Sequence, residues 1–356
     1  MTHERTSMRK ENHVDICIGE NVGYAARELF SDVELLHNPL PELDFDSIIT
    51  ETEFVGKKIS APIIINSMTG GAEKVHGFNK KLAESAEKHN IPLGLGSLRA
   101  VLENSNLIAT FEVRNYAPSI PIFGNIGMAQ VRNATNTFID NMKTIVDKLN
   151  LDALAVHLNP LQEIVQAEGD TNFSDCFEGI KHLKKSLGIP IIVKETGAGI
   201  NEFAAYQLDR INVDYIDVSG AGGTSWSKVE YMRKGARVEG FGEWGTHTAF
   251  LLPTVSRAVK RAKVIAGGGI YNGIIIAKAI ALGADYCASA RNFLIAVAQN
   301  NFDSEYEKLT KQLRTAMLLT GSKNIAQLKK ANLIIHSTLR SMLLSAQVDC
   351  SQFYFR

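Results

Sequence analysis

The chain has 356 residues, of which 45% are hydrophobic and 21% charged, so it is long and apolar enough to bury a sizeable core. Its 38 basic and 38 acidic side chains cancel to a formal net charge of zero, which argues against a nucleic-acid-binding surface. No apolar stretch is long enough to cross a membrane, the first residues are polar, and the four cysteines are scattered without metal spacing. We therefore expect a cytoplasmic protein that binds neither nucleic acid nor membrane.

Short apolar runs alternate with helical patterns from about residue 61 onward. The eight expected strands cover residues 62–66, 92–95, 121–124, 153–156, 190–193, 215–218, 263–266 and 285–288. The expected helices between them include residues 78–90, 137–149, 173–187, 200–210 and 273–282. Eight successive βα units predict an α/β fold, a closed (β/α)8 TIM barrel. An open doubly wound sheet is less consistent, because no GxGxxG turn follows the first strand.

The segments on either side of the barrel are expected to belong to the same domain. Residues 1–60 form an N-terminal arm and cap, and residues 61–356 form the barrel with its C-terminal helices. Beyond about residue 305, apolar side chains recur on one helical face, at Leu309, Leu313, Met317 and Leu318.

The densest group of polar side chains follows the fourth expected strand. Residues 153–156 are apolar, and the sequence HLNPLQE follows at residues 157–163. Pro160 cannot continue a ladder, so the strand ends near Asn159. In parallel α/β folds the carboxyl end of a strand is where chemistry takes place. Packing does not explain a His, an Asn, a Gln and a Glu gathered there, so we interpret this segment as part of a site.

Segments rich in glycine and other small residues follow the last three expected strands. SGAGGT occupies residues 219–224, GGG occupies residues 267–269, and ASAR occupies residues 288–291. Glycines let backbone N–H groups approach a ligand, and the helix that follows favours an anion. Barrels often hold a phosphate after strands seven and eight. These exits therefore predict a phosphorylated cofactor.

Lys194 ends the fifth expected strand, and its residue type leaves three interpretations open. It could form an ion pair with Glu195 at the barrel mouth. It could form a Schiff base with a carbonyl substrate. It could also be a fixed cation beside an electron-rich cofactor ring, where it would stabilise a reduced anion.

The motifs taken together resemble one known family, the type 2 isopentenyl-diphosphate isomerases, which are flavin-dependent barrels of the FMN-dependent dehydrogenase superfamily. The resemblance covers nearly the whole chain. Its motifs are RKENH (9–13), MTGG (68–71), GSLR (96–99), GNIG (124–127), HLNPLQE (157–163), QAEGDTNF (166–173), KETGAG (194–199), DVSGAGGTSW (217–226), EWG (243–245), and GGGIYNG with AKAIALGAD between 267 and 285.

The resemblance implies that FMN lies across the barrel mouth. The residues expected to contact it are Met68, Thr69, Ser97, Asn125, Lys194, Ser219, Thr224, Gly268, Gly269, Ala288, Ser289 and Ala290. One position departs from the family: Tyr271 follows Ile270 where the family often has an arginine. A side-chain contact to the phosphate is therefore not expected at that position.

The resemblance also implies a diphosphate substrate, isopentenyl or dimethylallyl diphosphate, whose double bond moves by a 1,3-allylic proton shift. The residues expected to bind it are Arg9, Lys10, Ser97, Arg99, His157, Asn159 and Gln162. Glu163 is the expected ligand of Mg2+. Gln162, Glu163 and Lys194 are the expected catalytic residues, Trp226 is a candidate wall of the alkene pocket, and NADPH or NADH is the expected flavin reductant. We also expect a homo-oligomer, a tetramer or an octamer.

Two other enzyme classes and a non-enzymatic role fit the sequence less well. A 2-hydroxy-acid oxidase on this scaffold needs a His base in an HGxR pattern, whereas residues 245–248 read GTHT. A reaction like that of IMP dehydrogenase needs a nucleophilic cysteine in a glycine-rich loop, and none of the four cysteines occupies one. A flavin-binding sensor would have no use for a clamp that holds a metal and a diphosphate.

Overall fold

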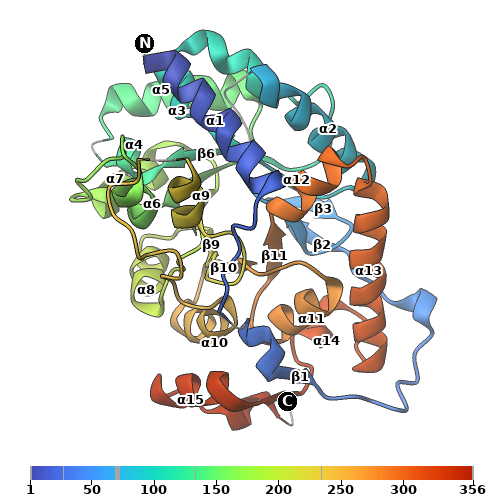
Figure 1. Cartoon of the computed structure of the whole chain (residues 1–356). Coiled ribbons are helices and arrows are strands. Elements are labelled where there is room, and N and C mark those ends of the chain that lie inside the picture. The colour runs from blue at the N-terminus through green and yellow to red at the C-terminus, as the bar shows by residue number, and fades with distance from the viewer. Residues whose placement is uncertain (1, 27, 69–72, 133, 234, 355–356) are drawn as a thin grey trace.

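The computed structural model describes residues 2–26, 28–68, 73–132, 134–233 and 235–354, and these contain a closed barrel of eight parallel strands (Figure 1). In chain order the strands are β4 (Ile63–Ile65), β5 (Leu93–Ser97), β6 (Ile122–Gly127), β7 (Ala153–Leu158), β8 (Ile191–Glu195), β9 (Tyr215–Asp217), β10 (Lys263–Gly267) and β11 (Tyr286–Ser289). β11 pairs with β4, Cys287 opposite Ile63, which closes the ring. The predicted TIM barrel and all of its expected strands are confirmed.

A hairpin closes the N-terminal end of the barrel. It consists of β2 (Thr52–Phe54) and β3 (Lys57–Ile59), which pair in antiparallel fashion. The Phe54 ring lies 4.8 Å from the ring of Tyr215 and 5.2 Å from that of Tyr286, centroid to centroid. Both tyrosines are first residues of their strands, so Phe54 fills the barrel at that end. The carboxyl ends of the strands remain as the mouth.

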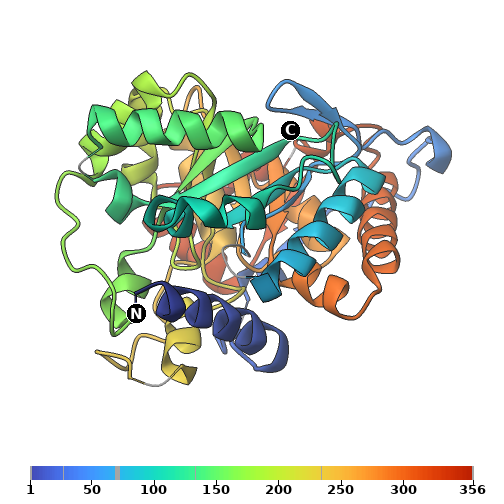
Figure 2. The same ribbon diagram turned by 90° about the horizontal axis from the view of Figure 1, so that it is seen from above.

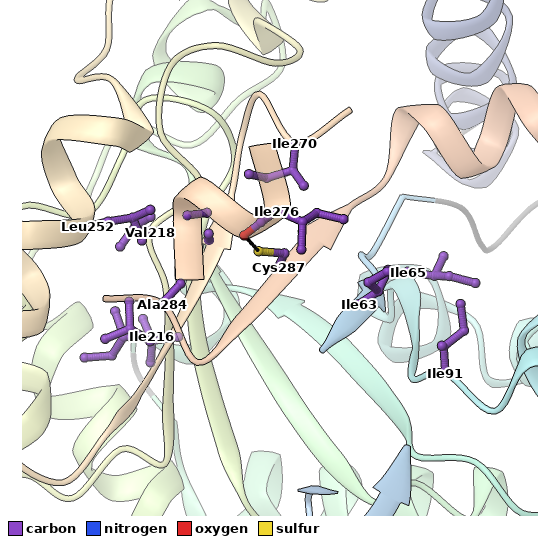
Figure 3. Packing of buried hydrophobic residues seen from close by; sticks show 14 of the residues in the cluster. Ile63, Ile65, Ile91, Ile216, Val218, Leu252, Ile270, Ile276, Ala284 and Cys287 are labelled. Carbon is purple, nitrogen blue, oxygen red and sulfur yellow. Dashed lines mark hydrogen bonds between the residues drawn. The ribbon is translucent and has the colours of Figure 1, made fainter. Parts of the chain in front are cut away.

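The longer helices surround the barrel (Figure 1). They are α2 (Glu73–His89), α5 (Asn136–Leu149), α7 (Cys176–Ser186), α8 (Glu202–Arg210), α10 (Thr248–Ala258), α11 (Gly273–Ala281), α12 (Arg291–Ala298) and α13 (Phe302–Leu319). Figure 3 shows this layer from close by, with Ile216 and Val218 lying near Leu252 of α10. The thiol of Cys287 donates to the carbonyl of Ile276 in α11 at 3.8 Å. Burial of these apolar faces is what fixes the helices to the barrel.

The remaining elements connect these layers. They are the helices α3 (Arg99–Glu103), α4 (Met128–Val131), α6 (Pro160–Val165), α9 (Trp226–Met232), α14 (Ile325–Leu328) and α15 (Ser337–Ser345), with 3-10 turns at Leu29–Asp32, Phe45–Ser47, Ser105–Phe111 and Cys350–Phe353. Two of them matter for the site, because α6 follows β7 and α9 follows the glycine-rich exit of β9.

The two ends of the chain meet the barrel differently. The N-terminal helix α1 (Thr2–Gly19) lies across the mouth side, packed against α2, α3, α9 and α12 (Figures 1 and 2). The short strand β1 (Val33–Leu35) pairs in antiparallel fashion with β12 (Leu333–Ile335), so the N-terminal and C-terminal parts of the chain share a small sheet. In α13 the predicted apolar face is buried at Leu309, Leu313 and Met317, while Leu318 is half-buried. Among the described residues, none of the helices has the length and apolar character that a membrane span needs.

Candidate active site

Two adjoining cavities open at the carboxyl ends of the barrel strands. The larger has a volume of about 320 Å³ and the smaller about 120 Å³. Five residues line both and form their common wall: Ser67, Met68, Lys194, Thr196 and Trp226. A ligand in one cavity would therefore lie directly beside a ligand in the other, at the end of the barrel where active sites occur.

The larger cavity is built from the glycine-rich exits. Of the residues expected to contact a cofactor, it is lined by Met68, Lys194, Ser219, Thr224, Gly268, Gly269, Ala288, Ser289 and Ala290. Gly268 has φ +85°, and a Cβ there would run into the carbonyl oxygen of Gly220. A Cβ on Gly223 would lie 2.9 Å from the amide nitrogen of Gly269. Only glycines permit this close approach of two loops, and it leaves main chain exposed to the cavity.

Buried polar groups beneath the larger cavity fit a polar ligand. The Ser67 hydroxyl is buried without a hydrogen-bond partner among the described residues, although it lines both cavities. Below it, the side-chain amide of Asn66 donates to Asp217 at 2.7 Å, and the Ser219 hydroxyl donates to the same carboxylate at 2.9 Å. A buried hydroxyl without a protein partner, facing a cavity, is a group that a polar ligand can satisfy. These residues therefore fit FMN.

The smaller cavity collects the residues expected to bind a substrate. It is lined by Lys10, Met68, Ser97, Arg99, Asn125, His157, Asn159, Gln162, Glu163 and Lys194. Ser97, expected beside both flavin and substrate, and Asn125, expected beside the flavin, line the smaller cavity and not the larger one. The ammonium of Lys10 reaches in from α1 and donates to the carbonyl of Ser97 at 3.0 Å. Thr69 lies outside the described residues, and so does the side chain of Arg9.

His157 is a neutral imidazole in this environment. Its Nδ1 lies 2.9 Å from Oδ1 of Asn125, an oxygen that can only accept, so Nδ1 carries the hydrogen. Burial, followed by the nearby charges of Lys194, Lys10 and Arg99, lowers the pKa of His157 to about 3. The positive charge of the smaller cavity therefore comes from lysine and arginine rather than from this histidine.

Lys194 is a buried side chain in the common wall. Its ammonium donates to the backbone carbonyl of Glu195 at 2.7 Å, and the Glu195 carboxylate instead accepts from the amides of residues 196–199. An ion pair between the two side chains is therefore not the arrangement found. Burial lowers the pKa of Lys194, and this is opposed by the negative charges of Asp217 and Glu195. Lys194 is directly opposite His157 and Asp217 on the neighbouring strands.

Two N–H groups donate to the Glu163 carboxylate in the short helix α6. The carboxylate accepts from the Asn159 amide at 3.1 Å and from the backbone amide of Asp170 at 2.8 Å. Asn159 Oδ1 is buried and has no partner among the described residues. The described residues hold no cluster of three or more His, Cys, Asp or Glu side chains with metal spacing. One carboxylate beside an amide oxygen still fits Mg2+, which keeps water and phosphate ligands.

Two residues of the site were missed by the sequence analysis. Glu230 of α9 is buried, accepts from Gln162 Nε2 at 3.1 Å and from His13 Nε2 at 3.0 Å, and forms an ion pair with Arg233. Burial by itself would raise the pKa of Glu230, but His13, Arg233 and Gln162 lower it to about 2. His13 lines the smaller cavity and packs edge-on against Trp226, with ring centroids 5.1 Å apart. Trp226 and Glu230 are four residues apart on α9, a spacing that could have indicated a common face.

Comparison with known proteins decides the family. Residues 127–335 match the family model described as FMN-dependent dehydrogenase. An isopentenyl-diphosphate delta-isomerase from Pyrococcus abyssi is 38% identical, covering 98% of each chain. One from Chlorobium limicola is 40% identical, covering 93% of this chain and 96% of the relative. The chain belongs to the type 2 isopentenyl-diphosphate isomerases.

Structures related to this isomerase family share its fold. A mandelate oxidase variant with the monooxide FMN adduct superposes with a TM-score of 0.64 at 16% identity, covering 94% of this chain and all of the other. At that identity the likeness shows a shared fold and nothing more. The residues that line the two cavities do not favour a 2-hydroxy-acid oxidase or a reaction like that of IMP dehydrogenase. His247, the histidine nearest to an oxidase pattern, lines neither of the two cavities, and neither do the four cysteines.

Proposed function

We propose that this protein interconverts isopentenyl diphosphate and dimethylallyl diphosphate by a 1,3-allylic proton shift, as a step in isoprenoid precursor biosynthesis. The observation that carries the proposal is the common wall, in which Lys194 and Trp226 line both cavities. A flavin ring in the larger cavity and a short alkene in the smaller would be in contact there. The FMN-dependent family and the isomerase relatives support this assignment of the two cavities.

The larger cavity suits FMN with its phosphate at the glycine-rich end of β10 and the small residues at the end of β11. Main-chain groups of Gly268, Gly269 and Ala290 line that end and would hold the phosphate. When bound and reduced, FMN supplies an electron-rich ring that can exchange a proton and balance positive charge. The buried ammonium of Lys194 beside it favours the anionic form of the ring. NADPH or NADH is the proposed reductant.

The smaller cavity suits a diphosphate bound to Mg2+. Lys10 and Arg99 supply positive charge, while Glu163 and Asn159 supply oxygen ligands for the ion. Neutralising the diphosphate at this end leaves the five-carbon tail to lie against apolar surface. Trp226 provides that surface and, as an aromatic face, also stabilises the tertiary cationic character that develops when the alkene is protonated.

Protons are handled by a hydrogen-bonded chain on the far side of the substrate cavity. Gln162 lines the cavity and donates to Glu230, which also accepts from His13 Nε2. Because the pKa of Glu230 is lowered to about 2, its carboxylate stays ionised and accepts from both side chains. Gln162 thus faces the substrate cavity with an ionised carboxylate behind it, and the arm helix α1 that carries His13 covers the cavity.

We also propose that the protein acts in the cytoplasm as a homo-oligomer, a tetramer or an octamer. Most soluble oligomers are homo-oligomers with closed symmetry, and the family resemblance is the ground for this proposal.

The direct test is turnover with catalytic reductant. Purified protein is incubated anaerobically with FMN, MgCl2 and isopentenyl diphosphate, with NADPH far below the substrate concentration. Many molecules of dimethylallyl diphosphate per NADPH are expected, because an isomerisation consumes no electrons. Consumption of one nicotinamide per product would support an oxidoreductase instead, and a protein that shows no flavin spectrum with added FMN would contradict the cofactor assignment.

A further inference from the structure

Arg291 connects the larger cavity to the N-terminal helix. It is the first residue of α12 and lines the larger cavity beside Ala290. Its Nε donates to the carbonyl of Cys17 at 2.7 Å, and its Nη2 donates to the carbonyl of Glu20 at 2.8 Å. These carbonyls lie at the C-terminal end of α1, where a cation is favourable. A guanidinium has five N–H donors in a rigid fork, so it can bind these carbonyls and a phosphate together.

The chain that follows α1 is itself part of the cavity wall. Gly23 lines the larger cavity and forms an antiparallel β-bridge with Thr224, which also lines it. The Tyr24 amide donates to the carbonyl of Gly223 at 3.3 Å, and the Ser225 amide donates to the carbonyl of Val22 at 2.8 Å. The position of the C-terminal end of α1 is therefore tied to the glycine loop against which a cofactor would bind.

The other end of α1 reaches the smaller cavity. The helix lies between α12, which carries Arg291, and α9, and apolar side chains of all three pack together, including Cys17 of α1, Val229 of α9 and Leu294 of α12. Along the same helix, Lys10 and His13 line the smaller cavity. A movement at the Arg291 end would carry both of these side chains with it, because a helix moves as a rigid rod.

We propose that Arg291 is a positioning residue that couples occupancy of the larger cavity by the FMN phosphate to the docking of α1, and thereby to the completion of the substrate cavity. The proposal rests on the proposed function in that the ligand is FMN. A phosphate bound to the guanidinium fixes its rotamer, so the two bonds to α1 form without a further loss of side-chain freedom. The coupling is reciprocal: docking of α1 raises the affinity for FMN by the same factor by which bound FMN favours the docking of α1.

The test is hydrogen exchange of the α1 peptide, residues 2–19, in the full-length protein with and without saturating FMN. FMN occupancy is followed separately by flavin fluorescence. In the wild type, FMN should slow exchange in α1 at least about fivefold, the lower end of typical coupling between sites. Arg291→Lys keeps the positive charge but loses the planar guanidinium with its several N–H donors. In this variant, bound FMN should slow hydrogen exchange in α1 less than about twofold. Riboflavin, which has the ring without the phosphate, should give little protection at concentrations where it is bound.

Arg257 offers a matched control. It also donates to two backbone carbonyls, those of Gln347 at 2.6 Å and Ala346 at 3.1 Å, but it joins α10 to the end of α15. Arg257→Lys should leave the effect of FMN on α1 at the wild-type value. Exchange in peptides covering β7 shows whether each variant is folded.

The outcomes separate this inference from the proposed function. If FMN binds but α1 exchange is unchanged, or is slowed equally in wild type and Arg291→Lys, the coupling is wrong while the function stands. Equal protection by riboflavin and FMN would also contradict a role for the phosphate. If wild-type protein binds no FMN, both proposals fall.

Discussion

Gln162 Nε2 donates to Glu230 Oε1 across 3.1 Å, although 68 residues separate the two in the chain. The bond joins α6, which follows strand β7, to α9, which follows the glycine-rich exit of β9. It places an ionised, buried carboxylate behind the amide that faces the substrate cavity. His13 of the N-terminal helix completes the group from a third direction.

Glu230→Gln tests this hydrogen-bonded chain. The variant keeps the shape of the side chain but loses the negative charge that accepts from Gln162 and His13, so we expect the turnover rate to fall at least about 100-fold, the usual scale for acid–base assistance. FMN binding should not change, because Glu230 does not line the larger cavity. Steady-state rates and a flavin titration measure both quantities. Glu168→Gln is the control: Glu168 also pairs with Arg233 but is 47% exposed, so its loss should matter little.

Glu163→Gln tests the metal site. Replacing the carboxylate by an amide removes the only charged oxygen ligand proposed for Mg2+, so the Mg2+ concentration needed for half-maximal activity should rise more than about tenfold. The flavin spectrum should stay as in the wild type. A titration of activity with MgCl2 measures the shift, and an unchanged Mg2+ dependence would remove Glu163 from the metal site.

The neutral state of His157 predicts a dependence of stability on pH. Its pKa is about 3 in the folded protein and about 6.5 in the unfolded chain, so the unfolded state binds the proton first as pH falls. The contribution to stability is complete above about pH 6.5 and is lost as pH drops towards 3. The melting temperature of His157→Gln should therefore fall less than that of the wild type between pH 7.5 and 5. Parallel curves for the two proteins would show that His157 titrates normally.

Tyr271→Arg tests the departure from the family pattern. Tyr271 lines the larger cavity and is 52% exposed, so an arginine there could reach the phosphate but would be partly screened by water. We expect FMN to bind about three- to tenfold more tightly, as one charge-assisted contact at an exposed site allows. Tyr206→Arg is the control, because Tyr206 is 49% exposed and lines neither cavity. Equal FMN affinity in wild type and Tyr271→Arg would place the phosphate elsewhere.

The barrel could be predicted from the sequence because each of its strands is a short apolar run. β4 and β8, for example, are buried at every position, and their mostly apolar residues already indicate that burial. The helix boundaries were less accurate. The expected helix at residues 78–90 begins earlier, at Glu73, and that at 173–187 begins later, at Cys176, after Asp175 in a left-handed conformation. Short helices such as α6 and α9 have too few turns to show a helical period.

The sequence predicted those site residues that directly follow a barrel strand. In a barrel the carboxyl ends of all strands meet at the mouth, so His157, Lys194 and the glycine loops could be assigned to one site before their contacts were known. Glu230 could not be found in this way, because its partners Gln162 and His13 are brought to it only by tertiary packing, His13 from 217 residues away. The N-terminal arm was expected, but its helical form depends on packing against α2, α9 and α12.

The measurement that tests the central claim most directly is isotope uptake in D2O. Protein with reduced FMN is incubated anaerobically with MgCl2 and isopentenyl diphosphate, and the product is analysed by NMR and mass spectrometry. We predict dimethylallyl diphosphate that carries deuterium in the methyl group formed by protonation of the alkene, with no net oxidation of the flavin. Dimethylallyl diphosphate without deuterium, or an oxidised product formed together with reoxidised flavin, would contradict the proposed proton shift.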